Sequence, residues 1–353
     1  MSISADERRA RILAEVQTLG SVRVVELAER LGIPAVTVRR DVAALADAGA
    51  VHRSHGSVSV AGRQDARPTD GPSLGLLVPG VGQYFDEVIA GARVAVAGAG
   101  AHLVLAISSY QASADRGQVE QLLKSGVDGL LLAPNWLPSD RLDTQAWVGE
   151  LAVPTVLVER RPARQSTAAE FDSVSSDHRH GVLLALRHLS SLGRRRIALV
   201  ARRDTYTAHQ VRTGYTDGCA LLGLTAEPVI DSGSPHVETE AIADQVAQLP
   251  ARGIDAVLVH NDQDAIQLLP LLRARGVKVP GDLSVVSYDD VFAALGAPPL
   301  TAVAPPKKAV GAEAAELLLR RIRGGAANPA LPVRHVQLLP ALMVRESCGA
   351  SIA

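Results

Sequence analysis

The sequence predicts an α/β protein in which a small helical module precedes parallel sheets covered by helices, on the strength of three observations. Residues 5–60 hold three segments with helical spacing of apolar residues and then a short hairpin pattern. From residue 73 onward, short runs of Val, Leu and Ile alternate with segments long enough for helices. Residues 61–72 lack an apolar period and combine Gly, Pro and charge, as linkers do. We therefore expect domains at 1–60 and 73–347, joined by a linker.

The overall composition excludes several classes of protein. Of the 353 residues, 47% are apolar, which is enough for large cores, and the net charge is −1. Cys219 and Cys348 are the only cysteines, so we expect neither a disulfide framework nor a cysteine-based metal site. The start of the chain is polar, and no apolar run reaches the ~18–20 residues that span a bilayer. The expectation is a cytoplasmic protein without a membrane segment, metal or cofactor.

The N-terminal module has the element order of a winged helix-turn-helix. Apolar residues recur on one helical face over 5–19 and again over 24–31, where Gly32 is suited to end the helix. A third helix is expected from residue 34 to about Asp47, and residues 50–60 alternate around a Gly-Ser turn as a hairpin does. Modules of this kind place their second or third helix in the major groove of DNA.

The third helix of this module, within "PAVTVRRDV", separates an apolar face from a face with one arginine. On a helical wheel Val38, Val42 and Leu45 cluster on the side that must pack inward, whereas Val36 and Arg40 lie opposite. The short side chains around the arginine let the helix backbone approach a surface closely. An ordinary solvated helix with incidental arginines is the alternative, and the neighbouring helices and hairpin favour the DNA-binding interpretation.

The chemistry of this face suits a nucleic acid. Arg40 can bond guanine O6 and N7, Thr37 can contact a phosphate or a thymine methyl, and Arg39 on the flank suits a phosphate. Asp41 would repel phosphate, so we expect it to hold Arg39 or an arginine of the first helix. The predicted DNA contacts are Val36, Thr37, Arg39, Arg40, Arg53 and His55.

The segments "TVRRDV" and "VHRSHGSV" resemble the N-terminal module of DeoR-type bacterial regulators over about residues 6–60. Arg8, Ile12 and Val16 fit the first-helix part of that signature. Pro34 stands where the family often has a small residue such as Ser, and we expect it at the first helical position. The resemblance implies a winged helix-turn-helix that binds double-stranded operator DNA.

Beyond residue 73 the apolar runs are nearly continuous, as in parallel strands covered by helices on both faces. The strand candidates are 74–80, 102–108, 129–134, 154–160, 196–202, 256–261 and 283–289. The helix candidates include 84–99, 111–126, 178–192, 236–249 and 262–276. This length favours two α/β lobes, and ligands of such sheets bind beyond the carboxyl ends of the strands.

The second region resembles the effector domain of the LacI/GalR regulators, which shares its fold with periplasmic sugar-binding proteins. The matching segments, from about Leu74 to Ser347, are "LLVPGVGQYFDEV", "GVDGLLLAPNW", "HLSSLGRRRIALV", "AVLVHNDQDAI", "VPGDLSVVSYDD", "PPLTAVAPP" and "LPALMVRES". The resemblance implies two periplasmic-binding-protein-like lobes with a sugar or related polyhydroxy effector in the cleft between them. It also implies a homodimeric, ligand-responsive repressor of carbohydrate catabolism or uptake genes that is not an enzyme.

Polar and aromatic residues at the strand ends are the candidates for effector binding. The predicted contacts are Tyr84, Phe85, Asn135, Trp136, Arg160, Arg212, Asn261 and Asp289. The two adjacent aromatics and Trp136 are alternatively core residues, and Asp289 alternatively ties a loop. Asp177 and Asp262 stand where helices begin, so we expect them to be helix N-caps.

Three departures from the family pattern limit what the resemblance implies. Val211 replaces a customary arginine, with Arg212 one residue on, and Pro305 replaces a customary glutamine, so the effector differs from a typical hexose. Residues 61–72 lack the apolar wedge of a LacI-type hinge helix, so no minor-groove intercalation is expected. The alternative function, a solute-binding protein of sugar transport, requires an export signal that is not seen. An enzyme would need a nucleophile elbow, phosphate loop or zinc spacing, and none is found.

Overall fold

The structure is a computed structural model that describes residues 4–19, 21–54, 57–60, 71–81, 84–137, 140, 142–162, 164–233, 239–324 and 331–350. The chain divides into two compact units. Unit 1 comprises residues 1–175 and 307–336, and unit 2 comprises residues 176–306 and 337–353. The chain therefore passes from one unit to the other three times.

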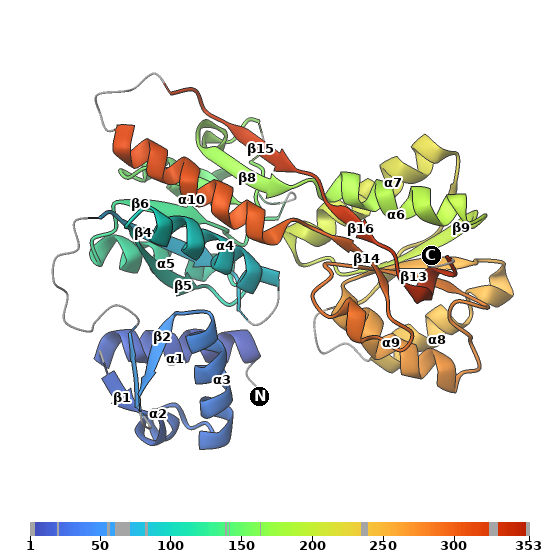
Figure 1. Ribbon diagram of the computed structural model, residues 1–353, viewed down its shortest axis with the longest axis horizontal. Coiled ribbons are helices and arrows are strands. Elements are labelled where there is room, and N and C mark those ends of the chain that lie inside the picture. The colour runs from blue at the N-terminus through green and yellow to red at the C-terminus, as the bar shows by residue number, and fades with distance from the viewer. Residues whose placement is uncertain are drawn as a thin grey trace. The chain divides into compact units, whose positions relative to one another are not determined.

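The N-terminal module within unit 1 is a winged helix-turn-helix (Figure 1). Its elements are α1 (Ala5–Leu19), β1 (Ser21–Arg23), α2 (Val24–Leu31), α3 (Ala35–Asp47), β2 (Val51–Ser54) and β3 (Ser57–Val60). The predicted hairpin is present as β2 and β3, in which Val51 pairs with Val60. Gly32 ends α2 with φ +64°, a left-handed conformation that favours glycine.

The module differs from the sequence-based expectation at two points. Strand β1, which the sequence did not predict, pairs antiparallel with β3 and completes a three-stranded sheet. Pro34 is the N-cap of α3, with an extended ψ of 133°, and does not occupy the first helical position. The proline ring has no hydrogen-bond acceptor, so α3 begins without a side-chain hydrogen bond from its N-cap residue.

The remainder of unit 1 is a mostly parallel sheet in the order β15-β8-β7-β6-β4-β5. The strands are β4 (Ser73–Val78), β5 (His102–Ile107), β6 (Gly129–Leu132), β7 (Thr155–Val158), β8 (Asp172–Ser176) and β15 (His335–Leu338). Its helices are α4 (Tyr84–Gly98), α5 (Ala112–Lys124) and α10 (Lys307–Gly324), with short helices η1 (Leu142–Glu150) and η2 (Thr167–Glu170). The four pairs among β4 to β8 are parallel, as the apolar runs predict.

Helices α4 and α10 lie side by side on one face of this sheet (Figure 1). Their backbones touch where a glycine on each helix faces the other. A Cβ atom on Gly91 would overlap the carbonyl oxygen of Lys308, and one on Gly311 would overlap that of Val88. The absence of side chains at these two positions therefore permits the close crossing.

Unit 2 contains the second sheet, in the order β10-β9-β12-β13-β14-β16, with β11 also paired to β9. The strands are β9 (Arg196–Ala201), β10 (Thr225–Ala226), β11 (Ile230–Asp231), β12 (Ala256–His260), β13 (Ser284–Tyr288), β14 (Thr301–Ala304) and β16 (Ala341–Met343). The helices are α6 (His178–Ser191), α7 (Tyr206–Leu222), α8 (Thr239–Ala247) and α9 (Asp262–Ala274), with short helices η3 (Pro250–Arg252), η4 (Ala293–Leu295) and η5 (Glu346–Cys348). Only β16 runs antiparallel to its neighbour, β14, among the described strand pairs of this sheet.

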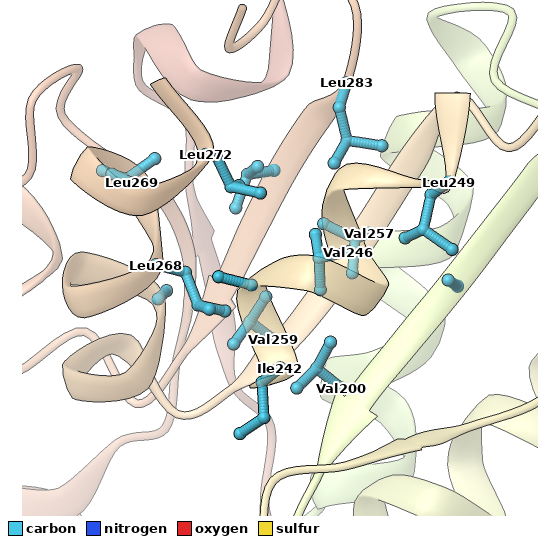
Figure 2. Packing of buried hydrophobic residues seen from close by; sticks show 14 of the residues in the cluster. Val200, Ile242, Val246, Leu249, Val257, Val259, Leu268, Leu269, Leu272 and Leu283 are labelled. Atoms are coloured by element: carbon cyan, nitrogen blue, oxygen red, sulfur yellow. The ribbon is translucent and has the colours of Figure 1, made fainter. Parts of the chain in front are cut away.

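Alternate residues of the unit 2 strands supply two separate cores. Figure 2 shows the core on one face, where Val200 of β9 and Val257 of β12 meet Val246 of α8 and Leu268 of α9. The other face packs against α6 and α7. Because both faces are covered, the strands consist mainly of buried apolar residues, and the polar residues Arg202, Asn261 and Asp289 directly follow three of them.

Candidate functional site

Helix α3 divides its residues between core and solvent as its sequence predicts. The side chains of Val38, Val42 and Leu45 are at most 1% exposed. On the opposite face Val36 is 73% exposed, and Arg40 is also exposed. The outer face of α3 is therefore open to solvent and carries one apolar side chain beside an arginine.

Asp41 is the buried anchor of this helix. It is 0% exposed, and its carboxylate accepts hydrogen bonds from the Arg8 guanidinium, including one from Nη2 to Oδ1 at 3.2 Å. Arg9 Nε also donates to Asp41 Oδ1, at 3.4 Å. Asp41 is therefore turned away from solvent and neutralised by two arginines of α1. This confirms the prediction that it holds a first-helix arginine.

The other predicted DNA contacts are placed as follows. Arg39 on α3 and Arg53 on β2 are exposed, and Thr37 is half-buried in the first turn of α3. His55, at the turn of the hairpin, lies outside the described residues, as does most of the predicted linker. The described contacts thus fall on α3 and on the adjacent strand.

In unit 1, the predicted aromatic pair stands at the first turn of α4. The rings of Tyr84 and Phe85 meet edge to face, with centroids 5.4 Å apart. Tyr84 Oη donates to Oε1 of Glu159 at 2.7 Å, and the ammonium of Lys307 lies 5.7 Å from the Tyr84 ring centroid. Phe85 is 7% exposed, which favours a packing role for its ring. Tyr84 instead belongs to a polar cluster with Glu159 and Lys307.

Asn135 and Arg160 are engaged inside unit 1. The Asn135 amide donates to Ser108 Oγ at 2.7 Å and to Asp115 Oδ1 at 2.9 Å, so both of its N–H groups are used. Burial raises the pKa of Asp115, and the hydrogen bonds from the Asn135 backbone and from side chains oppose that shift. Arg160 is 4% exposed and donates to the carbonyl oxygens of Pro134 and Glu159. Both side chains join successive strand-end loops.

Trp136 belongs to a hydrophobic core. It is 4% exposed and packs in one cluster with Val148, Leu157 and Ala168. Of the two alternatives left open by the sequence, this placement favours the core residue over an aromatic platform for a ligand.

In unit 2, the predicted residues also make internal contacts. Arg212 on α7 donates to the carbonyl oxygen of Arg202 at 2.7 Å and pairs with Asp231. Asn261 is the N-cap of α9, where its side chain accepts from the backbone N–H of Asp264 at 3.2 Å. The sequence predicted Asp262 as the N-cap of this helix, but the N-cap is the preceding residue, Asn261.

Asp177 fulfils its prediction, since it caps α6 by accepting a hydrogen bond from the His180 backbone at 3.0 Å. Asp289 follows β13 and is 7% exposed. His260, at the end of β12, is 4% exposed, and its Nδ1 has no hydrogen-bond partner among the described residues. Burial lowers the pKa of His260 to about 3, so the imidazole is neutral at physiological pH.

Strained backbone marks the carboxyl ends of three strands. The described residues other than glycine with a positive φ are Ser109 (55°), Tyr110 (56°), Glu159 (53°), Asp289 (94°) and Asp290 (50°). They follow β5, β7 and β13, on the edges where parallel sheets bind ligands. Strain of this kind persists at functional sites because the surrounding structure enforces it. Sequence reasoning passed over Ser109, Tyr110 and Asp290, which no residue-type pattern distinguishes.

Neither a membrane span nor a metal site is found in the described part of the chain. No helix there is long and apolar enough to cross a bilayer. No cluster of His, Cys, Asp or Glu side chains there has the composition of a metal site.

Comparisons with known proteins identify a similar domain in each of the two regions of the chain. A model of the DeoR-like helix-turn-helix domain matches residues 8–64, and a model of the periplasmic binding protein-like domain matches residues 186–348. The HTH-type transcriptional repressor PurR of Vibrio atlanticus is 30% identical over 259 residues, which are 71% of this chain and 75% of that protein. The arabinose metabolism transcriptional repressor of Geobacillus stearothermophilus is 25% identical over 332 residues, which are 91% of this chain and 89% of that protein.

Among solved structures, the complex of the transcriptional regulator CelR with cellobiose has a TM-score of 0.66 at 26% identity, covering 89% of this chain and 90% of that one. These three similar proteins are transcriptional regulators. The chain belongs to the LacI family of ligand-responsive transcriptional repressors and carries a DeoR-like helix-turn-helix at its N-terminus.

Proposed function

We propose that this repressor reads operator DNA through the outer face of α3 and that a carbohydrate effector alters its affinity for that DNA. The observation that carries the proposal is the charge distribution of α3. Arg39 and Arg40 are exposed in its first two turns, whereas Asp41 is buried against two arginines of α1. This face of α3 therefore presents cations to a phosphate backbone without an exposed carboxylate beside them.

Arg40 is the residue that we assign to base recognition. It lies opposite the buried side of α3, beside the exposed Val36, so a groove that receives the helix meets both side chains. The guanidinium matches the O6 and N7 atoms of guanine, and Val36 suits a thymine methyl. Thr37, Arg39 and Arg53 are proposed as backbone or flanking contacts, and His55 is proposed from its sequence position alone.

The proposed effector is a sugar or a related polyhydroxy compound. Two similar regulators act in arabinose metabolism or bind cellobiose. Hydroxyl groups suit the carboxylates at the strand ends, because a carboxylate accepts two or more hydrogen bonds. Among the predicted contacts we retain Tyr84 in unit 1 and Asp289 in unit 2 as the leading candidates. We also propose that the protein acts in the cytoplasm as a homodimer that binds two half-sites.

The DNA-binding proposal is tested by selecting bound sequences from a random duplex pool with the full-length protein. Affinity for the selected duplex is then measured by fluorescence anisotropy at several salt concentrations. Arg40→Ala should weaken binding by about 1–3 kcal/mol. The control is Arg187→Ala, which removes an exposed arginine of α6 in unit 2. Equal affinities for wild type and Arg40→Ala would contradict the assignment.

The effector proposal is tested by a thermal-shift screen against pentoses, hexoses, cellobiose, sugar phosphates and nucleosides. A ligand that binds only the folded state raises the melting temperature by mass action. The compound with the largest shift should also change the affinity for the selected duplex. A shift produced only by nucleosides would exclude a carbohydrate effector.

The proposed dimer is tested separately, by mass photometry of the free protein.

A further inference from the structure

We infer that Asp262 and Arg345 are positioning residues for effector binding, because together they fix the loop of residues 289–293 that carries Asp289. This inference rests on the proposed function, in which Asp289 contacts the effector. Neither residue is a predicted ligand. They come from segments more than 80 residues apart, the start of α9 and the segment after β16, and they converge on one loop of unit 2.

Asp262 holds the second half of the loop. Its Oδ2 atom accepts backbone hydrogen bonds from Val291 at 2.6 Å, Phe292 at 2.7 Å and Ala293 at 3.1 Å. The carboxylate is 1% exposed, so little water competes for these three N–H groups. Three consecutive amides directed at one oxygen form an anion-binding nest, whose geometry depends on the negative charge.

Arg345 holds the first half of the loop. Its Nη1 donates to Asp290 Oδ1 at 2.7 Å and its Nη2 to Asp290 Oδ2 at 3.2 Å, so the pair is bidentate. Nη1 also donates to the carbonyl oxygen of Leu300 at 2.8 Å. The arginine is itself fixed, because its backbone N–H donates to Thr301 Oγ1 at 2.8 Å and its carbonyl accepts from the same hydroxyl at 2.9 Å.

The loop needs such restraints because its backbone is strained where the predicted ligand stands. Asp289 has φ 94° and Asp290 has φ 50°, conformations that L-residues adopt only when their surroundings enforce them. The backbone N–H of Asp289 continues the ladder to the carbonyl oxygen of Val303 at 3.0 Å. The loop is thus fixed at its start by the sheet, at Asp290 by Arg345 and beyond it by Asp262.

A carboxylate that is held in place before the ligand arrives binds it more tightly, since no loop ordering is then required. If the Arg345 side chain is removed, the Asp289 carboxylate is still present, but the backbone at Asp289 and Asp290 can relax to a negative φ. The two positioning residues therefore act on effector affinity only through Asp289, and this dependence distinguishes them from residues that merely stabilise unit 2.

A double-mutant cycle on the full-length protein tests this inference. The probes are L-arabinose, D-xylose, D-ribose, D-glucose, D-galactose and cellobiose, and Kd is measured by calorimetry, well below the melting temperature, for the sugar that wild type binds most tightly. Arg345→Ala should weaken binding about tenfold, as expected for coupled neighbours, and have little effect in an Asp289→Asn background. Arg345→Lys keeps the positive charge but loses the bidentate guanidinium, so its Kd should lie between that of wild type and that of Arg345→Ala.

The matched control is Arg321→Ala, which breaks the bidentate Arg321–Asp172 pair in unit 1. It should lower the melting temperature and leave the Kd unchanged. Hydrogen exchange provides a second measurement, in which Asp262→Asn should speed exchange of a peptide covering residues 289–296 and leave a peptide covering β9 unchanged.

The possible failures are distinct. Equal effects of Arg345→Ala in both backgrounds, or wild-type affinity of Arg345→Ala, would overturn the positioning role alone, provided that Asp289→Asn weakens binding. Wild-type affinity of Asp289→Asn, or the absence of binding of every sugar to wild type, would overturn the proposed effector site and this inference with it.

Discussion

Helix α3 and the carboxyl edge of the unit 2 sheet use charged residues in opposite ways. On α3 the side chains of Arg39 and Arg40 are exposed to solvent, whereas the adjacent carboxylate, that of Asp41, is buried. At the sheet edge, Asp262 and Asp289 are at most 7% exposed, and Arg345 bonds to a carboxylate and a carbonyl oxygen of its own unit.

The difference indicates what each surface is suited to bind. Exposed arginines pay little desolvation penalty when they meet phosphate, and their contribution is therefore sensitive to salt and to the number of contacts. Buried charges act through geometry, because each is fixed by several hydrogen bonds and moves only if that network breaks. Variants at the exposed arginines of α3 should therefore change DNA affinity without changing stability, whereas variants at buried charges should change stability.

The largest effect is expected at Asp41, the one charge of α3 that belongs to the buried class. Asp41→Ala leaves Arg8 and Arg9 without their shared carboxylate and should destabilise the N-terminal module by about 3 kcal/mol. DNA binding should be lost at temperatures where effector binding by the same protein persists. The control is Asp47→Ala, which removes an exposed carboxylate from the end of the same helix. Comparable loss of DNA binding in both variants would contradict the buried role of Asp41.

A second effect should appear in the pH dependence of unit 2 stability. Burial lowers the pKa of His260 to about 3, below its unfolded value of 6.5, so its contribution to stability is present above pH 6.5 and is lost as pH falls. Burial raises the pKa of Asp264 to about 6, above its unfolded value of 3.8, so its contribution is present below pH 3.8 and is lost as pH rises through 6.

Between pH 4 and 6 these two contributions have opposite slopes and nearly cancel. His260→Gln should make the free energy of unfolding fall with rising pH, and Asp264→Asn should make it rise, each by roughly 1.4 kcal/mol per pH unit relative to wild type. Urea unfolding at pH 4, 5 and 6 measures the slopes. Slopes of the same sign in the two variants would show that burial does not control these groups.

The apolar runs predicted most strands with two covered faces, although β14 was missed, and several other elements depend on partners far along the chain. Strand β8 carries Asp172 and serines and has no apolar run, yet it is buried because Arg321 of α10 satisfies the aspartate. Strand β1 was not predicted, because three residues are too few to show alternation. Local patterns cannot reveal such distant partners.

The sequence predicted which kinds of residue lie at the strand ends, but it predicted the roles of only some of them. Residue types at strand ends located the polar edges, but Asn261 and Asp262 are both good helix caps, and only the loop that Asp262 binds shows which one caps α9. For Trp136 the sequence left two roles open, since an aromatic after a strand suits either a core or a ligand site. Asp41 was predictable because a carboxylate cannot face phosphate favourably.

Conservative substitution at Arg40 should separate base recognition from charge. Arg40→Lys keeps the positive charge but loses the planar fork, so affinity for the selected duplex should fall by about 1–3 kcal/mol while the salt dependence stays as in wild type. Repeating the sequence selection with this variant should relax the preference at one base pair of each half-site. Arg39→Lys is the matched control, and loss of selectivity there instead would exchange the roles of the two arginines.

The smallest effect is expected for Arg39→Ala, which tests whether the flank of α3 contacts only phosphate. A lost phosphate contact weakens binding to every sequence alike and lowers the slope of log affinity against log salt by about 0.9 per half-site contact. The selected sequence should stay the same, because no base contact is removed. If Arg39→Ala changes the selected sequence and leaves the salt slope unaltered, the exposed arginines of α3 cannot be divided into one that positions the helix and one that recognises a base.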